Sequence, residues 1–334
     1  MMLRTQPLRA ISSRPASAAS HSVWKVASIA FVLCIAPIFV TAMDFPLKRM
    51  PLFTHVVDYE ASWSPDSQRI VLISDRHGGM HVHIMAAGDT SGGSDMKQVT
   101  SGVAEDDSPA WSPDGRKIAF VSVRAGMSHI YVMDVDGTAL HQVTNGNGQE
   151  IHPMWSADGS RILFNTTMFH EAKPSSDQSA AEPNRFIGEK TDDFMDLATI
   201  RPDGSDLRRI THGGGYTYAS FSPDGQLILH RRQQEGRSQI FLMNSDGSND
   251  HSLSGAFTSD GWPAWSPDGK RIVFSRHVGD RFQIFVMSRD GSDARQLTDA
   301  DGEFTNPRWS PDGRRILCGR RLGGVSLALF DAPH

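Results

Sequence analysis

The sequence predicts an all-β fold, a six-bladed β-propeller built from four-stranded antiparallel blades. Three observations carry this prediction: one phrase recurs six times, its period is near 44 residues, and each period contains four strand-like segments. Helical periodicity is absent after residue 45, so the segments between the repeats favour strands and turns.

The recurring phrase is Trp-Ser-Pro-Asp or a close variant of it. Its aspartates are Asp66, Asp114, Asp158, Asp224, Asp268 and Asp312. Successive aspartates lie 48, 44, 66, 44 and 44 residues apart, and the interval of 66 equals one period of 44 plus 22 further residues. Six copies in phase indicate six structural units, with one insertion in the third.

The second repeat shows how one unit divides into strands. Its first strand ends at Trp111, and residues 112–115 form a turn because Pro presets φ and Gly tolerates positive φ. Residues 117–123 alternate apolar and polar side chains and give the second strand. Residues 129–134 give the third strand and residues 139–144 the fourth.

The last unit lacks a fourth strand of its own. It begins at Trp309 and ends with the strand-like residues 326–330, while residues 47–54 precede the first repeat as a spare strand. We therefore expect the N-terminal strand to join the last blade, close the ring and cover an edge that would otherwise be exposed.

Residues 1–42 have the character of an export signal. Residues 1–25 carry four basic and no acidic side chains, residues 26–40 are apolar except for Ser28, and small residues around Ala42 suit a cleavage site. An apolar run of about 15 residues is short for a helix that must span ~30 Å of hydrocarbon. The pattern predicts a signal peptide, with a signal anchor as the alternative, and a periplasmic or secreted propeller over residues 43–334.

The charge of the chain argues against a nucleic-acid partner. The 33 basic and 38 acidic side chains give a net charge of −5. Residues 1–43 hold four of the basic ones, so the predicted propeller has 29 against 38, a net charge of −9. Binding to nucleic acid depends on neutralising phosphates with Lys and Arg. We therefore expect no nucleic acid among its partners.

Three short motifs carry a resemblance to a known family. W-S-P-D-G-x-x-I-x-F is followed by I-x-V-M-x-x-D-G and then by Q-L-T, and this order resembles the propeller repeat of TolB-like proteins over residues 45–330. TolB itself carries a separate α/β domain before its propeller, and we expect no counterpart between residues 42 and 45. The repeat is also similar to those of prolyl-oligopeptidase-type peptidases and oligogalacturonate lyases.

Strand parity sorts the loops of each blade onto two faces. Connections between antiparallel strands alternate between faces, so the Ser-Pro-Asp-Gly turns share one face with the Asp-Gly turns that join third and fourth strands. Connections from second to third strands and from blade to blade lie on the opposite face, where they vary in length. We expect function on this variable-loop face.

Polar and aromatic side chains precede the aromatic residue of each first strand. If the first strands are innermost, these side chains ring one mouth of the central channel as an acidic, aromatic-lined funnel for a cation, a polar segment of a partner or a sugar. The alternative is that the acids cap turns by accepting backbone N–H bonds. The candidate binding residues are Asp58, Glu60, Asp106, Asp107, Glu150, His152, Tyr216, Tyr218, Asp260, Trp262, Glu303 and Asn306.

The insertion in the third repeat covers about residues 168–193 and projects, by parity, from the variable-loop face. A loop of this length is usually functional or disordered, and its Ser, Ala, Pro and Glu content favours partial disorder. A flap over the funnel and an inert insertion are the two alternatives.

His77, His81 and His83 form the most metal-like cluster of the sequence. His81 and His83 would share one face of a strand, but catalytic zinc needs a third ligand and an open position. The alternative is that these are solvent-facing strand histidines, and we assign no metal ligands. Ca²⁺ in the central channel is a further hypothesis, because Ca²⁺ takes 6–8 oxygen ligands.

Binding is favoured over catalysis. The sequence has no G-x-S-x-G nucleophile motif and no Walker motif. We expect a monomeric, extracytoplasmic module that holds a protein partner or an envelope polymer and meets a membrane only through an uncleaved N-terminal segment. The alternative is a carbohydrate-active enzyme. The resemblance of the repeat to oligogalacturonate lyases implies histidines around a divalent metal. Within the predicted funnel, His152 is the one histidine that could serve as such a ligand.

Overall fold

The computed structural model describes residues 57–88, 95–170, 194–234, 237–255, 258–298, 302–322 and 325–333. The chain divides into two units, residues 1–44 and 45–334, and every described residue belongs to the second. Within the described ranges there is no α-helix, and hence none long and apolar enough to cross a membrane. The predicted signal segment lies outside these ranges.

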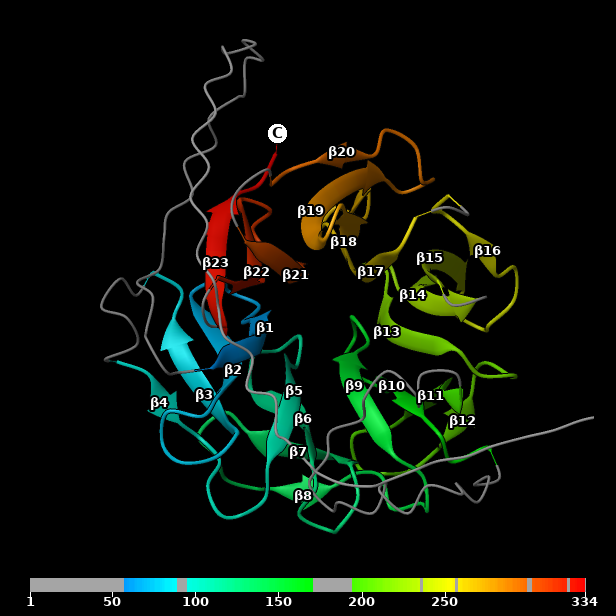
Figure 1. The fold of residues 1–334 in the computed structure, drawn as a ribbon. Coiled ribbons are helices and arrows are strands. Elements are labelled where there is room, and N and C mark those ends of the chain that lie inside the picture. The colour runs from blue at the N-terminus through cyan, green and yellow to red at the C-terminus, as the bar shows by residue number, and fades with distance from the viewer. Residues whose placement is uncertain are drawn as a thin grey trace, which may run out of the picture. The chain divides into compact units, whose positions relative to one another are not determined.

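The described strands form six antiparallel sheets arranged around a ring (Figure 1). The first three blades contain β1 (Asp58–Trp63), β2 (Arg69–Ser74), β3 (His81–Ala86), β4 (Lys97–Gln98), β5 (Asp106–Trp111), β6 (Lys117–Ser122), β7 (His129–Asp134), β8 (His141–Gln142), β9 (Glu150–Trp155), β10 (Ile162–Thr166), β11 (Asp196–Ile200) and β12 (Arg208–Arg209). The last three contain β13 (Tyr216–Phe221), β14 (Leu227–Gln234), β15 (Arg237–Asn244), β16 (His251–Ser252), β17 (Asp260–Trp265), β18 (Arg271–Val278), β19 (Arg281–Ser288), β20 (Arg295–Gln296), β21 (Glu303–Trp309), β22 (Arg315–Arg321) and β23 (Val325–Asp331).

The predicted six-bladed propeller is confirmed. Five sheets have four strands in chain order, and the sixth has the three described strands β21, β22 and β23. The first strand of every blade lies innermost, around the centre of the ring (Figure 1). The strand predicted over residues 47–54 lies outside the described residues, as do residues 171–193 of the insertion between β10 and β11.

The turn after each first strand is fixed by the same side-chain contacts. In the second blade, Ser112 Oγ donates to Asp114 Oδ1 at 2.6 Å, and the Lys117 backbone N–H donates to Ser112 Oγ at 2.9 Å. Equivalent contacts recur in the other five turns. The hydrogen bond from Ser112 lowers the pKa of Asp114 below its usual value. Serine and aspartate therefore specify tight turns on one face of the ring.

The hydrophobic core lies between neighbouring blades rather than at one centre. Val121 and Val132 of the second blade pack with Ile162 and Phe164 of the third, and all four are fully buried. Similar clusters lie at the other junctions between blades. This arrangement leaves the axis of the ring to the side chains of the innermost strands.

Direct contacts between the sixth and first blades close the ring. The Arg315 guanidinium lies 4.6 Å from the Trp63 ring centroid and donates to the Ser67 carbonyl at 2.9 Å. Trp63 Nε1 in turn donates to the Arg308 carbonyl at 3.3 Å. Leu317 of β22 also packs in one buried cluster with residues of the first blade. The terminal blades thus contact each other through described residues.

We expect Arg315→Met to lower the free energy of unfolding by about 1–2 kcal/mol, because it removes a cation–π contact and two hydrogen bonds across the closing junction. Arg69→Met is the matched control. The Arg69 guanidinium lies 4.7 Å from the Trp111 centroid at an interior junction, and no side-chain hydrogen bond accompanies it among the described residues. Urea unfolding should show the smaller loss for the control. Equal losses would show that the Arg315 contacts at the closing junction contribute no more to the free energy of unfolding than the Arg69 contact at an interior junction.

Candidate functional site

One residue in each first strand has a left-handed backbone. These six residues have φ between 47° and 53° and lie three positions before the strand's terminal aromatic residue. They are Glu60, Ser108, His152, Tyr218, Trp262 and Asn306. The pairing register between first and second strands shifts at this point in all six blades. A bulge of this kind re-aims one side chain of a strand.

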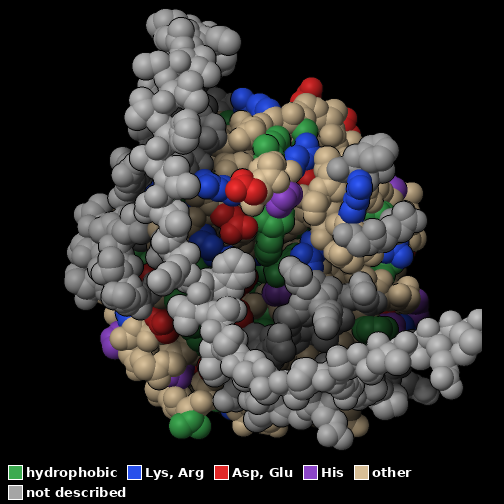
Figure 2. Space-filling view, viewed as in Figure 1, with side chains coloured by type: hydrophobic (Ala, Val, Ile, Leu, Met, Phe, Trp, Pro, Cys, Tyr) green, Lys and Arg blue, Asp and Glu red, His purple; other side chains and the backbone are tan. Residues whose placement is uncertain are grey.

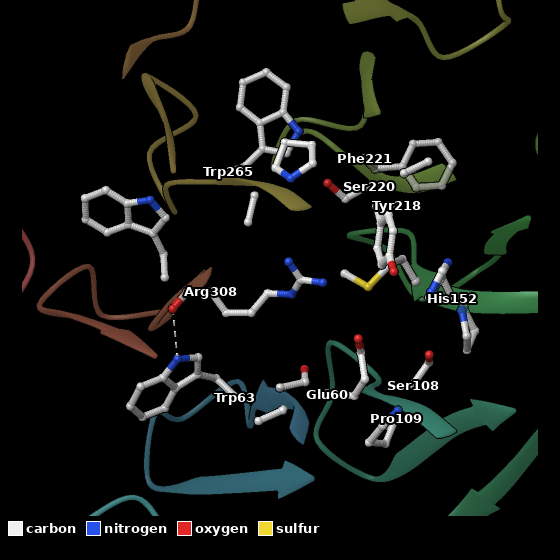
Figure 3. Close-up of a pocket in the computed structure, with 18 of the residues that line it drawn as sticks. Glu60, Trp63, Ser108, Pro109, His152, Tyr218, Ser220, Phe221, Trp265 and Arg308 are labelled. Carbon is white, nitrogen blue, oxygen red and sulfur yellow. Dashed lines mark hydrogen bonds between the residues drawn. The ribbon is translucent and has the colours of Figure 1, made fainter. Parts of the chain in front are cut away.

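Four of the six bulge residues line a cavity on the axis of the ring (Figure 3). The cavity has a volume of about 220 Å³, and Glu60, Ser108, His152 and Tyr218 contribute to its wall. Arg308, two residues beyond the bulge of the sixth blade, also lines it. Further lining residues belong to the ends of the first strands, next to the Ser-Pro-Asp-Gly turns. The cavity therefore extends from the bulges toward the tight-turn face, away from the mouth expected from the sequence.

Four of the predicted acids lie inside the blades and not around an open mouth: Asp58, Asp106, Glu150 and Asp260, all buried. Asp260 accepts hydrogen bonds from Arg276 Nε at 2.7 Å and Nη2 at 2.8 Å. Asp58 and Asp106 pair at 2.9 Å with arginines that follow the second strands of their own blades. Asp58, Asp106 and Asp260 thus tie the first strands of their blades to the second strands.

Glu150 and Tyr216, which begin the first strands of the third and fourth blades, also have partners within the ring. Glu150 Oε2 lies 2.6 Å from His129 Nδ1 and accepts from Thr144 Oγ1 at 3.0 Å, so it joins the third blade to the second. The Arg232 guanidinium covers the Tyr216 ring at 4.6 Å. An aromatic ring here replaces the carboxylate that pairs with arginine in other blades.

Two of the predicted residues are one position out of register. Asp107 precedes the bulge residue Ser108, lies between two blades and accepts from the Tyr59 hydroxyl at 3.3 Å. Glu303 precedes the register position held by Phe304 and forms a 3.6 Å ion pair with exposed Arg321. Sequence reasoning missed Ser108 and Arg308, although counting back from each terminal aromatic residue would have found Ser108.

Burial raises the pKa values of the carboxyl groups on one side of the channel. Burial raises the pKa of Glu60 above its usual value, and Arg308 opposes that shift. Burial, and then repulsion by Glu60, raises the pKa of Asp107 to about 7. Asp107 is therefore only partly charged near neutral pH, whereas the nearby Arg308 favours the charged form of Glu60.

The opposite side of the channel is neutral to positive. Burial, followed by Arg231 and Arg308, lowers the pKa of His152 to about 3, so its imidazole is neutral at pH 7. Burial also lowers the pKa of Arg308 from its usual value. On the face shown in Figure 2, acidic, basic and histidine side chains all lie near the centre of the ring. The channel is thus of mixed charge and not an acidic funnel.

A row of aromatic rings connects the cavity with the variable-loop face. The His152 and Tyr218 rings stack with centroids 4.0 Å apart, and Trp262 follows 5.7 Å from Tyr218. Phe282 lies 5.1 Å from Trp262, and exposed His277 lies 5.1 Å from Phe282. Such a row offers flat apolar surface to a ligand that enters the channel from this face.

Of the three histidines in the first blade, His77 is exposed, whereas His81 and His83 are not solvent-facing, contrary to the alternative considered from the sequence. His81 and His83 are 2% and 0% exposed. His83 Nε2 lies 3.0 Å from His77 Nδ1, whereas His81 Nδ1 lies 3.6 Å from Asp106. In the described part of the chain, no three His, Cys, Asp or Glu side chains are spaced to hold a metal ion.

The residues around the cavity fit Ca²⁺ poorly. Glu60 supplies one carboxylate to the wall, and Arg308 places a positive charge in the same space. Ca²⁺ binds 6–8 oxygen ligands, several of them usually anionic carboxylates. A guanidinium in the cavity favours a ligand that also carries negative charge.

Comparison with known proteins adds a family and a set of similar folds. A family model described as the TolB beta propeller domain matches residues 20–205 and 186–317. The structure of a putative TolB from Agrobacterium tumefaciens is similar with a TM-score of 0.61 and 24% identity, over 84% of this chain and 92% of that one. An oligogalacturonate lyase in complex with manganese is similar with a TM-score of 0.58 and 13% identity, over 84% and 91%.

TolB from Acinetobacter baumannii is similar over a smaller part of its length. The TM-score is 0.60 and the identity 19%, over 76% of this chain. The match spans 57% of that TolB. A search of the sequences of curated proteins found no match. At these identities the structural similarities show the fold.

Proposed function

The chain belongs to the TolB β-propeller domain family, and from this premise we propose that it binds a protein partner or an envelope polymer through its central channel. The observation that supports binding is the set of six bulges. Glycine would meet the need for positive φ at the lowest cost. Five of the six blades instead carry a side chain as large as Asn or larger there, three of them the rings of His152, Tyr218 and Trp262. Strain retained at equivalent positions around one channel points to use of those side chains.

The proposed site of action is outside the cytoplasm. The basic stretch, apolar run and small residues near Ala42 support export, with either a cleaved signal or a retained anchor. The row of rings from His152 to His277 supports entry of the partner from the variable-loop face. A partner could then extend an exposed polar segment into the channel while its body rests on that face.

One observation supports the alternative of a carbohydrate-active enzyme. Asp107, whose pKa is raised to about 7, lies beside the channel that His152 lines. Groups with pKa values moved toward neutrality are common where protons are transferred. An enzyme of this kind would turn over oligogalacturonate with added Mn²⁺, and His152→Ala would abolish the turnover. Turnover that survives His152→Ala would remove His152 from that role.

Capture from envelope extract tests the binding proposal. The tagged full chain should retain a protein or polymer, and the Tyr218→Ala/Trp262→Ala double variant should retain at least 10-fold less, because it removes two adjacent rings of the channel row. Circular dichroism would check that the variant keeps its fold. Leu140→Ser is the control, because Leu140 is 42% exposed and lies between β7 and β8, on the opposite, tight-turn face. Capture that is equal in wild type and double variant, or absent in both, would refute binding through the channel.

A further inference from the structure

Two opposite charges face the cavity without contacting each other. Arg308 Nη1 donates to the Pro307 carbonyl at 3.1 Å, and no carboxylate oxygen of the described residues lies within 4.0 Å of its side-chain nitrogens. The uncharged Asn306 side chain hydrogen-bonds Glu60 and favours its charged form, and no cationic nitrogen of the described residues lies within 4.0 Å of the Glu60 carboxylate oxygens. Figure 3 shows Arg308 extending across the cavity, with Glu60 on one side and Tyr218 on the other.

An unpaired charge in a protein-enclosed space is costly. A guanidinium has five N–H donors, and a buried charge is tolerated when it is paired and hydrogen-bonded. Arg308 uses one donor on a neighbouring carbonyl, which leaves most of its fork toward the cavity. Glu60 and Arg308 attract each other, yet the bulge and the strand hold them apart. The gap between them suits a group that presents a negative end to Arg308 and a positive end to Glu60.

We propose that the cavity binds a zwitterion of amino-acid size, with its carboxylate on Arg308 and its ammonium group on Glu60. This inference rests on the proposed use of the channel for binding and names the chemistry of what it holds. An arginine fork matches the two oxygens of a carboxylate, and a carboxylate matches an ammonium group. The volume of about 220 Å³ accommodates one free amino acid or one zwitterionic end of a larger chain.

The surroundings of the two charges fit the same ligand. His152 Nδ1 and Ser220 Oγ are buried atoms of lining residues with no hydrogen-bond partner among the described residues. Arg231 lies 4.8 Å from the Tyr218 ring and adds positive potential on that side, whereas Asp107 adds to the acidic side near Glu60. The cavity is polarised from one wall to the other.

Ligands with a single charge fit less well. A simple anion would be attracted by Arg308 but repelled by Glu60. A simple cation would be attracted by Glu60 but repelled by Arg308. A neutral polyol would leave both charges without a counter-charge. Only a ligand with both charges compensates both walls at once.

Isothermal titration calorimetry of the full chain tests this with three probes. L-leucine carries both charges, N-acetyl-L-leucine only the carboxylate and L-leucinamide only the ammonium group. We expect L-leucine to bind at least 10-fold more tightly than either analogue. Arg308→Gln should weaken L-leucine at least 10-fold and abolish its preference over L-leucinamide. Glu60→Gln should weaken it similarly and abolish its preference over N-acetyl-L-leucine.

The paired loss of preference separates recognition from general damage, because a misfolded variant would lose all three probes together. Arg321→Gln and Glu303→Gln are the matched controls, since that pair is also an Arg and a Glu but lies at the surface. Both controls should bind L-leucine as wild type does. If wild type binds the three probes equally, or binds none of them and not the peptide probe either, the zwitterion assignment is wrong.

A final arm identifies the source of the zwitterion. A synthetic tripeptide ending in meso-diaminopimelate carries a zwitterionic side chain on a larger chain. Tighter binding of this peptide than of L-leucine would assign the site to a polymer end, and the reverse order would assign it to free amino acids. The two proposals fail separately. Capture from envelope extract that is unchanged by Tyr218→Ala/Trp262→Ala would overturn channel binding. Capture that this double variant reduces but Arg308→Gln leaves unchanged would leave channel binding standing and overturn the zwitterion.

Discussion

Asp260→Ala should lower the free energy of unfolding by about 3–5 kcal/mol, because it leaves a partly buried guanidinium without its counter-charge. The Asp260 side chain is fully buried, and that of Arg276 is 19% exposed. Thr258 Oγ1 donates a further hydrogen bond to Asp260 Oδ2 at 3.0 Å. The substitution removes three bonds at the point where β17 enters the blade. Urea unfolding at pH 7 measures the loss.

Glu303→Ala is the control for this prediction. Glu303 lies at the start of β21, as Asp260 does in β17, but its ion pair with Arg321 is long and exposed. Exposed pairs contribute about 0–1 kcal/mol. A loss at Asp260 no larger than the loss at Glu303 would show that the buried pair does not hold the blade together. A small loss of stability in Asp260→Ala would therefore contradict the prediction, whereas a variant too unstable to express would agree with it.

Asp107→Asn should increase stability progressively as pH rises from about 4 to about 7, by roughly 1–3 kcal/mol at the upper end. The pKa of Asp107 is raised to about 7 by burial and by Glu60, while an unfolded aspartate titrates near 3.9. Between these values the folded chain holds a proton that the unfolded chain has released. The wild-type carboxyl is therefore most compatible with folding below pH 4 and least compatible above pH 7.

His152 changes stability in the opposite direction. Its pKa is lowered to about 3, so the folded chain disfavours protonation and stability is lost as pH falls from about 6.5 toward 3. The two slopes partly cancel in the wild type, and Asp107→Asn should expose the slope of His152. Urea unfolding at pH 4.5, 6 and 8 would reveal it. Parallel curves for wild type and variant would contradict the raised pKa.

Asp136→Asn is the control for the pH series. The pKa of Asp136 is lowered by hydrogen bonds from Thr138, so its charged form is the favoured one in the folded chain. Asp136 is exposed on a turn. Its replacement should not reproduce the gain in stability above pH 6. A similar gain at both positions would indicate a general effect of net charge.

The repeat pattern was sufficient to predict the architecture. The spacing of the Ser-Pro-Asp phrases gave six units, and alternation within residues 117–123 gave a strand that the structure has as β6. These features are local: a turn depends on four residues, and a strand on alternate positions of one segment. The family resemblance followed from the same local motifs and is confirmed.

The site was predicted in part. Counting from the terminal aromatic residues correctly placed Glu60, His152 and Tyr218 on the channel, because position within a repeat survives folding. Ser108 lies at the same position of the count, but the prediction chose the more polar Asp107 next to it. It also assigned Asp58 and Asp260 to an open mouth, although each is bound by an arginine 16 or 18 residues later in the chain.

The amino-acid sequence by itself determined the six blades, their turns and the face on which the loops vary. Only the tertiary structure decided where each first-strand side chain points. A bulge adds one residue to one strand of a pair and so breaks the simple alternation from which facing is read. Closure of the ring then brings Arg308 of the last blade near Glu60 of the first. The proximity of these two side chains depends on the packing of all six blades, which no single segment of the sequence determines.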